Sequence, residues 1–92
     1  MKIEFDPRKD ASIRRKHSIS LALSKEFDWR HEIAWVDKRF AYDECRMICL
    51  IAQGDTLYVA VYVDRGDVRR MISLRKANRR EVTDYARDNQ DY

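Results

Sequence analysis

The residues best suited to chemistry in this sequence are a dense group of arginines in its last third. Residues 65 to 80 contain six Arg and one Lys against a single acidic residue, Asp67. The whole chain has a formal net charge of only +3, so the other residues are together net acidic. A guanidinium group is planar and binds two phosphate oxygens at once. The cluster therefore indicates a polyanion-binding face, although a solvated surface or a patch for an acidic protein would show the same pattern.

Thiols and imidazoles are too few for the common metal and nucleophile sites. Cys45 and Cys49 are too far apart along a strand to form a disulfide, and no second Cys or His pair completes a zinc site. We expect two reduced thiols that pack as small apolar groups. His17 and His31 are isolated in the sequence. A zinc enzyme or a Cys–His hydrolase is therefore disfavoured, and no metal or cofactor is expected.

The elements that would position the arginines follow from hydrophobic alternation and capping residues. A strand is expected over residues 2 to 5, and a helix then begins with Asp6 as N-cap and Pro7 and runs to about residue 17. Ser20 caps a second helix that ends near residue 28, and residues 33 to 37 form the next strand. Residues 46 to 52, 57 to 63 and 68 to 74 are expected to be strands joined by glycine-containing turns.

The last predicted strand and the element after it carry the basic cluster. Alternation along this strand predicts two faces, one with Arg70, Ile72 and Leu74 and the other with Arg69, Met71, Ser73 and Arg75. Asn78 and Glu81 have the spacing of a capping box, which would start a third helix. The fold class is therefore α+β, with the order strand, helix, helix, an antiparallel meander of about four strands and a C-terminal helix. We expect the helices on one face of the sheet.

Length and hydropathy favour one small domain. We place it at residues 1 to 88, followed by a polar tail at residues 89 to 92. The longest uncharged run, residues 47 to 54, is too short to span a membrane. The first residues also lack the apolar segment of a secretory signal. We therefore expect a cytoplasmic protein without membrane contact.

Several segments of the chain resemble one known family. They are Phe5-Asp6-Pro7-x-Lys9, Lys16-His17-Ser18-Ile19-Ser20, Asp43-Glu44-x-Arg46, Arg70-Met71-Ile72-Ser73-Leu74-Arg75-Lys76-Ala77, Arg79-Arg80-Glu81 and Tyr85. With this spacing the sequence is similar to the BrnT toxins of bacterial type II toxin–antitoxin systems, and the segment that ends at Ala77 is the most specific match. Ser18 stands where the family usually has Gly, which predicts a backbone that need not be left-handed there.

The resemblance implies both a fold and an activity. It implies a RelE-like fold and RNA cleavage that inhibits translation. It also implies a cognate BrnA-like antitoxin that neutralises the toxin and binds DNA, so that this chain would meet DNA only through its partner. An isolated chain would expose the antitoxin-binding surface and could self-associate.

Metal-free RNA cleavage gives the candidate residues their roles. The ribose 2′-hydroxyl attacks the neighbouring phosphorus, so the protein must accept one proton, deliver another and stabilise the phosphate charge. The candidate catalytic residues are Arg75, Arg70, Glu81, Tyr85 and His17, and the candidate phosphate-binding residues are Lys76, Arg79, Arg80 and Arg46. Arg75 is the leading candidate, because strand geometry and the family segment coincide there.

Each proton-transfer candidate also has a purely structural explanation. Glu81 completes the capping box, Tyr85 could pack its ring on the sheet, and His17 ends a helix, where a basic residue is favourable. Glu44 is expected to pair with Arg46 rather than to transfer protons. Trp35 is expected to pack in the core.

Two other classes of function stay open on the sequence alone. The first is a catalytically inactive module that binds RNA or the antitoxin. The second is a DNA-binding domain that uses the basic helix, although the sequence contains no recognisable helix-turn-helix or zinc arrangement.

Overall fold

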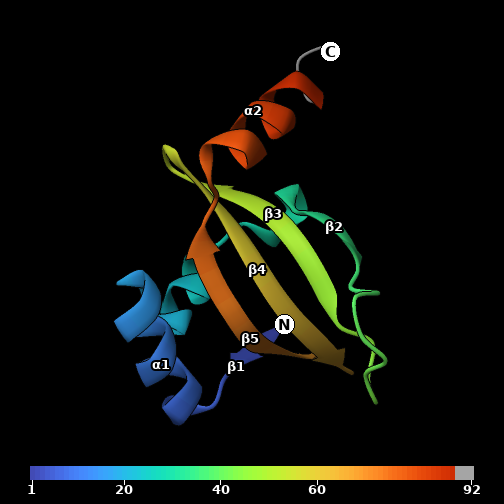
Figure 1. Cartoon of the computed structure of the whole chain (residues 1–92). Helices are drawn as coiled ribbons and strands as arrows, with labels where there is room; N and C mark the ends of the chain where they lie inside the picture. Colours follow the sequence, from blue (N-terminus) through green and yellow to red (C-terminus); the bar gives the residue numbers. More distant parts are fainter. Residues whose placement is uncertain (89–92) are drawn as a thin grey trace.

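A five-stranded mixed sheet forms the centre of the protein. The computed structural model describes residues 1–88, and the predicted polar tail at 89–92 lies outside the described residues. Figure 1 shows the elements in chain order: β1 (Lys2–Glu4), α1 (Pro7–His17), η1 (Leu21–Glu26), η2 (Trp29–His31), β2 (Ile33–Val36), β3 (Met47–Gln53), β4 (Thr56–Arg65), β5 (Val68–Lys76) and α2 (Arg79–Asp88). The predicted α+β class is confirmed.

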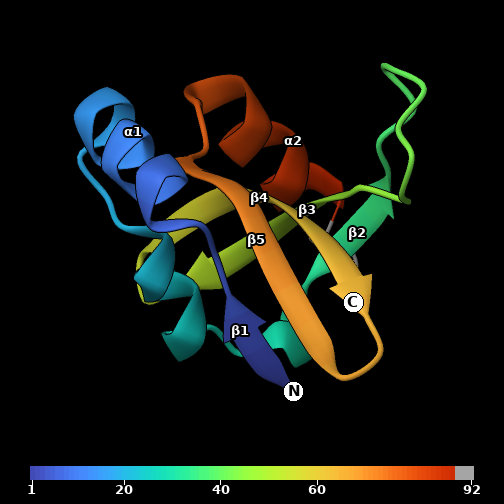
Figure 2. The same cartoon turned by 90° about the horizontal axis from the view of Figure 1, so that it is seen from below.

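The strands are arranged in the order β1-β5-β4-β3-β2. Strands β2 to β5 form the predicted antiparallel meander, whereas β1 pairs in parallel with β5, from Lys2 opposite Val68 to Glu4 opposite Arg70. A parallel pair needs a long crossover, and here the crossover is everything between β1 and β5. The first strand thus lies at one edge of the sheet and β2 at the other (Figure 2).

Helix α1 begins as the sequence predicts and ends differently. Asp6 caps it by accepting a hydrogen bond of 2.8 Å from the backbone N–H of Arg8, and Pro7 occupies the first helical position. The helix ends at Ser18, which has a left-handed backbone with φ of 59° and donates its N–H to the carbonyl of Arg14. The expectation of an ordinary backbone at Ser18 was therefore wrong, because the left-handed residue satisfies this carbonyl and terminates the helix.

The predicted second helix is instead the short 3₁₀ segment η1, and a further 3₁₀ segment, η2, follows just beyond its predicted end. Ser20 caps η1 as predicted, by accepting a hydrogen bond of 3.1 Å from the N–H of Ala22. The buried carboxylate of Asp10 in α1 accepts hydrogen bonds from the N–H of Leu21 (2.7 Å) and the hydroxyl of Ser20 (3.0 Å). These bonds tie the start of η1 to α1.

The core lies on one side of the sheet, which we call the closed face. It consists of side chains from β3, β4 and β5 packed against α1, η1 and the residue that follows η1: Ile13, Leu21, Phe27, Cys49, Ile51, Tyr58, Ala60, Tyr62, Met71 and Leu74. Helix α2 contains no buried residue and projects from the end of the sheet where β5 finishes (Figure 1). The expectation that all helices pack on one face was therefore wrong.

A β-bulge in β5 changes which arginines share a face. Tyr62 pairs with Met71 and Val61 pairs with Ser73, so Ile72 is an extra residue in the ladder. Met71 and Leu74 consequently both lie in the core, although alternation places them on opposite faces. Arg70 and Arg75 lie opposite Val63 and Val59, and both side chains reach the other side of the sheet, which we call the open face. The predicted separation of these two arginines was wrong.

None of the helices in the described part of the chain is both long and apolar enough to cross a membrane.

Candidate functional site

The open face contains a hollow of about 320 Å³. Its lining comes from all four meander strands, the loop between β2 and β3, and the first turn of α2: Trp35, Arg39, Arg46, Ile48, Val59, Val61, Ile72, Ser73, Arg75 and Glu81. Apolar strand residues form one part of this lining, and three guanidinium groups with a single carboxylate form the charged part. The hollow is therefore a cationic depression on an apolar sheet.

Arg75 and Glu81 form the central contact of the hollow. The two guanidinium NH groups of Arg75 donate to the two carboxylate oxygens of Glu81, at 2.8 and 2.9 Å. This contact raises the pKa of Arg75 and holds the pKa of Glu81 below its usual range. Both groups are therefore charged at neutral pH, and Glu81 occupies the side of Arg75 that an oxyanion would bind.

Glu81 is also the capping residue that the sequence predicts. Its carboxylate accepts a hydrogen bond from the N–H of Asn78, and the Asn78 side chain accepts one from the N–H of Glu81, both at 2.8 Å. The capping box is thus confirmed, and it fixes the carboxylate at the start of α2. Glu81 therefore contacts both the N-terminus of α2, through Asn78, and β5, through Arg75.

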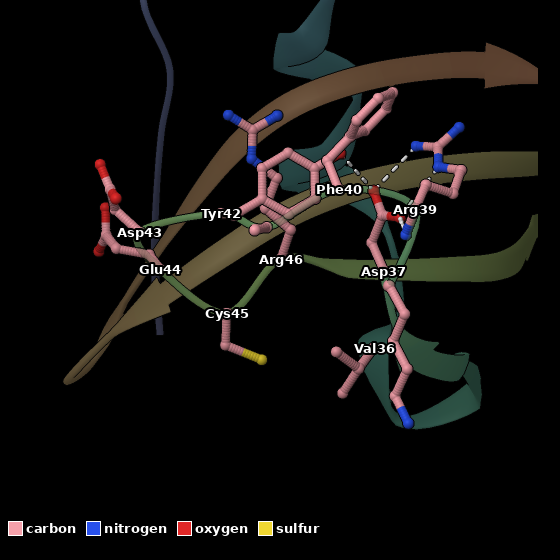
Figure 3. Close-up of a pocket in the computed structure, with 11 residues that line it drawn as sticks. Val36, Asp37, Arg39, Phe40, Tyr42, Asp43, Glu44, Cys45 and Arg46 are labelled. Atoms are coloured by element: carbon pink, nitrogen blue, oxygen red, sulfur yellow. Dashed lines mark hydrogen bonds and ion pairs between the residues drawn. The ribbon is translucent and has the colours of Figure 1, made fainter.

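Arg39 enters the hollow from the loop between β2 and β3. The carboxylate of Asp37 accepts two hydrogen bonds of 2.9 Å from the Arg39 guanidinium and one of 3.0 Å from the Tyr42 hydroxyl (Figure 3). The Asp37 side chain has no exposed surface, and its contact with Arg39 holds its pKa well below the usual range. Arg39 is therefore anchored on one side while its remaining N–H groups are available to a ligand.

Arg46 lies where the hollow meets its neighbours. Its guanidinium stacks 4.3 Å above the ring of Tyr42, and it makes no salt bridge with any residue that the structure describes. It lines the hollow around Arg75, the hollow around the β2–β3 loop, and a third one that also contains Arg65 and Arg70. Among the residues that the structure describes, Arg46 thus forms no salt bridge, and it lies at the junction of three depressions.

The structure places the other candidate residues outside the central hollow. Arg70 pairs with Glu4 at 3.2 Å and lines the third hollow. Lys76, Arg79 and Arg80 are exposed at the end of β5 and the start of α2. Tyr85 lies one helical turn beyond Glu81, and His17 ends α1, which does not contribute to the lining of the hollow.

Two local expectations about packing were wrong. Glu44 does not pair with Arg46, because its carboxylate accepts hydrogen bonds from Arg65 across the hairpin, one of them at 2.6 Å. Trp35 is 45% exposed rather than part of the core, since it lies on the open face near the edge of the sheet. Its ring is available on the wall of the hollow.

Arg69 is part of the basic cluster in the sequence, but its side chain does not lie on the exposed basic surface. The guanidinium stacks on Tyr62 at 3.7 Å and on Trp29 at 4.6 Å, and it pairs with Glu32 and Asp64, both at 2.7 Å. Its side chain is only 12% exposed. Arg69 therefore has a packing role on the closed face.

Sequence reasoning missed Asp37 and Arg39. The order Arg39, Phe40, Tyr42 and Arg46 interleaves cations with aromatic rings, which is typical of segments that bind single-stranded nucleic acid. This pattern was the available signal. It was hidden because the segment lies in a loop and contains as many acidic residues as it does aromatic ones.

Metal-ligating groups are sparse in the same region. Over residues 1–88, no group of three or more His, Cys, Asp or Glu side chains is placed to hold a metal ion. Both cysteines are free thiols, with Cys45 exposed and Cys49 buried. The hollow itself offers one carboxylate, which Arg75 already binds.

A comparison with protein-family models shows which family the chain belongs to. The model described as "Ribonuclease toxin, BrnT, of type II toxin-antitoxin system" matches residues 5–81. The chain belongs to the BrnT toxin family. The match covers every residue that lines the central hollow, so the BrnT part of the chain contains the whole cationic depression. A search of curated proteins found no match.

Membership of the BrnT family identifies the chain as a ribonuclease toxin of a type II toxin–antitoxin system. It therefore has RNA as its substrate class and an antitoxin as its partner class.

Proposed function

We propose that this BrnT toxin cleaves RNA without a metal ion and that the hollow around Arg75 is its active site. The observation that carries the proposal is the convergence of Arg39, Arg46 and Arg75 on one depression with a single carboxylate, Glu81. Cleavage through the ribose 2′-hydroxyl needs this kind of site, because negative charge builds up on the phosphate and no external nucleophile is required.

The arginines would stabilise the phosphate in the transition state. Asp37 already holds Arg39 in place, so this guanidinium needs little reorganisation when charge develops on the phosphate oxygens, whereas Arg75 becomes available when phosphate displaces Glu81. Arg46 makes no salt bridge with a carboxylate in residues 1–88 and would bind a phosphate oxygen directly. Removing one well-placed donor from such a site typically lowers the rate by about 10²–10³-fold.

Glu81 would act as the proton acceptor. Its lowered pKa keeps it ionised at neutral pH, and a phosphate that binds Arg75 displaces it from the guanidinium. The released carboxylate takes the proton of the 2′-hydroxyl as the 2′-oxygen forms a bond to phosphorus. The bond from phosphorus to the 5′-oxygen breaks, and that oxygen takes up a proton from Tyr85 or from water. The products are a 2′,3′-cyclic phosphate and a 5′-hydroxyl.

The remaining basic residues would bind the RNA on either side of the cleaved bond. Arg70 would contact a neighbouring phosphate in the third hollow. The RNA chain would then pass the end of β5, where it would contact Lys76, Arg79 and Arg80. His17 takes no step in this proposal, because α1 does not contribute to the hollow.

A BrnA-like antitoxin would neutralise the toxin by covering the open face, and it would provide the only contact with DNA. The apolar side chains exposed on or near this face are Ile33, Trp35, Val36 and Phe40. Without the antitoxin they would favour self-association. The antiparallel meander with flanking helices also supports a RelE-like topology, and a toxin that acts on translation would work in the cytoplasm.

RNA cleavage in the presence of EDTA tests this function. Arg75→Ala should lower the cleavage rate by about 10²–10³-fold, and Arg75→Lys should recover only part of it because Lys lacks the bidentate fork. Arg8→Ala removes an exposed Arg at the start of α1 and should cleave like the wild type. A wild-type protein that cleaves only with added Mg²⁺, or an Arg75→Ala protein with full activity, would contradict the proposal.

One observation favours a second candidate, an inactive module that binds RNA or the antitoxin. Glu81 closes the anion-binding side of Arg75 in this structure. If phosphate cannot displace Glu81 from Arg75, the chain will bind RNA but will not cleave it in EDTA. Expression of the chain alone will then not slow bacterial growth.

A further inference from the structure

Phe40 is the most exposed of the large apolar side chains, with 69% of its surface accessible. It lies in the loop that joins β2 and β3 and that supplies Arg39 and Arg46 to the open face. An apolar ring in this position loses the benefit of burial. Single exposed apolar side chains are common on proteins, so the role of this ring follows from the contacts that hold it and the charges beside it.

The surrounding contacts hold this exposed ring in place. Phe40 packs edge-on against Tyr42, with ring centroids 5.9 Å apart and the planes at 74°. The Tyr42 hydroxyl donates to Asp37, and Arg46 stacks on the Tyr42 ring (Figure 3). A backbone hydrogen bond of 2.8 Å from Asp37 to the carbonyl of Arg46 closes the base of the loop. A ring ordered in this way loses little conformational freedom when a ligand binds.

The ring is next to the cations of the proposed active site. Arg39 and Arg46 line both the hollow that contains Phe40 and the hollow that contains Arg75. A phosphate bound by these arginines therefore brings the base of its nucleotide close to the loop. An aromatic platform beside a cationic groove is the usual way to bind single-stranded nucleic acid.

We propose that Phe40 stacks on an unpaired nucleobase of the RNA next to the cleaved phosphate, an inference that rests on the proposed function. The base must leave its neighbours to reach the ring, so the loop selects single-stranded RNA over duplex. The charges of the loop favour RNA over a protein as the occupant of this ring. Two of the three loop carboxylates are already bound by cations, Asp37 by Arg39 and Glu44 by Arg65. The other charged residues of the loop are the cations Lys38 and Arg46 and the carboxylate Asp43.

Binding of a short single-stranded RNA with a 2′-O-methyl group at each position tests the proposal without cleavage. Phe40→Ala should weaken binding by about 5- to 150-fold, as expected for the loss of one base–aromatic stack. Phe40→Trp should bind like the wild type. Ile33→Ala removes another exposed apolar side chain, one that does not line the loop hollow, and should have no effect.

An abasic substitution made at each RNA position in turn shows whether a base is the partner of Phe40. At one position the loss of the base should weaken binding to the wild type by the same factor, and it should not further weaken binding to Phe40→Ala. Equal binding by Phe40→Ala and the wild type would overturn the proposal.

The same variants separate this proposal from a role in antitoxin binding and from failure of the proposed function. If Phe40→Ala binds RNA normally and escapes inhibition by the antitoxin, the ring is a protein contact and base stacking is refuted. If the wild type binds RNA through Phe40 but does not cleave it in EDTA, the proposed catalytic function fails while the base site stands. If the wild type does not bind the blocked RNA, both proposals fail.

Discussion

Replacing Glu81 by Gln separates the two roles that the structure gives to this carboxylate. The Gln side chain has nearly the same shape and is also a good residue for this position of a capping box, so α2 should still form. The change removes the negative charge that faces Arg75. It thereby frees the guanidinium for phosphate and removes the proposed proton acceptor at the same time.

The size of the binding effect follows from the geometry of the pair. The contact is bidentate, and the side chains of Arg75 and Glu81 are 37% and 28% exposed. For a pair this accessible to solvent, about 1 kcal/mol is a reasonable contribution. Phosphate must replace Glu81 at Arg75, so Glu81→Gln should tighten RNA binding by about fivefold. The cleavage rate should fall by about 10²–10⁴-fold, because a positioned base is lost.

Binding of a 2′-O-methyl RNA and single-turnover cleavage of the unmodified RNA measure the two effects separately. Glu26→Gln, which makes the same charge change at an exposed site in η1, is the matched control for general electrostatic attraction. If the two variants gain affinity equally, Glu81 does not occupy the phosphate position. If Glu81→Gln cleaves at the wild-type rate, Glu81 is not the base.

Three further outcomes follow from contacts away from Arg75. Arg69→Ala removes a largely buried cation from Glu32 and from the more exposed Asp64, so the free energy of unfolding in urea should fall by about 1–3 kcal/mol; a change below 1 kcal/mol would contradict its packing role. The pKa of Asp37 is lowered by Arg39, so this pair stabilises the fold above the ordinary pKa of Asp, and the gain is lost as pH falls through the lowered value. Asp37→Asn should therefore weaken the dependence of stability on acid pH in thermal unfolding, and an unchanged dependence would refute this. Burial raises the pKa of Cys49 to about 12, so iodoacetamide should label Cys45 alone in the folded protein, and labelling of both thiols would contradict the buried position.

Local sequence signals predicted the elements of the sheet well. Asp6 with Pro7 and Asn78 with Glu81 are short-range caps, and the structure confirms both. The meander follows from alternation within single strands, which needs no knowledge of distant residues. Each of these features depends on residues that are close together in the sequence. They can therefore be predicted without knowing the tertiary structure.

The features that the sequence did not predict depend on pairing between distant segments. The bulge at Ile72 exists only in the register between β4 and β5, and it decides that Arg70 and Arg75 share a face. The parallel pairing of β1 with β5 is likewise a tertiary choice. Arg39 reaches the hollow because Asp37 folds the loop back, and no spacing rule predicts that contact.

The candidate site was therefore predicted in part. Arg75, Glu81 and Arg46 were named from the sequence, and the structure brings all three to one hollow. His17 was named for its chemistry alone, and α1 keeps it outside that lining. Whether the named residues act in catalysis stays a prediction.

Helix α2 contains no buried side chain, and this has a consequence for how easily the proposed site opens locally. Opening this helix exposes little new apolar surface beyond the half-buried Tyr85, and the capping box and the contact with Arg75 add to its resistance to fraying. Amide protons of α2 should exchange with solvent far sooner than those of β4, which is a central strand with mostly buried residues. The carboxylate of the proposed site is therefore carried by a helix that we expect to open readily, and its guanidinium by β5, a strand that pairs with a neighbour on each side.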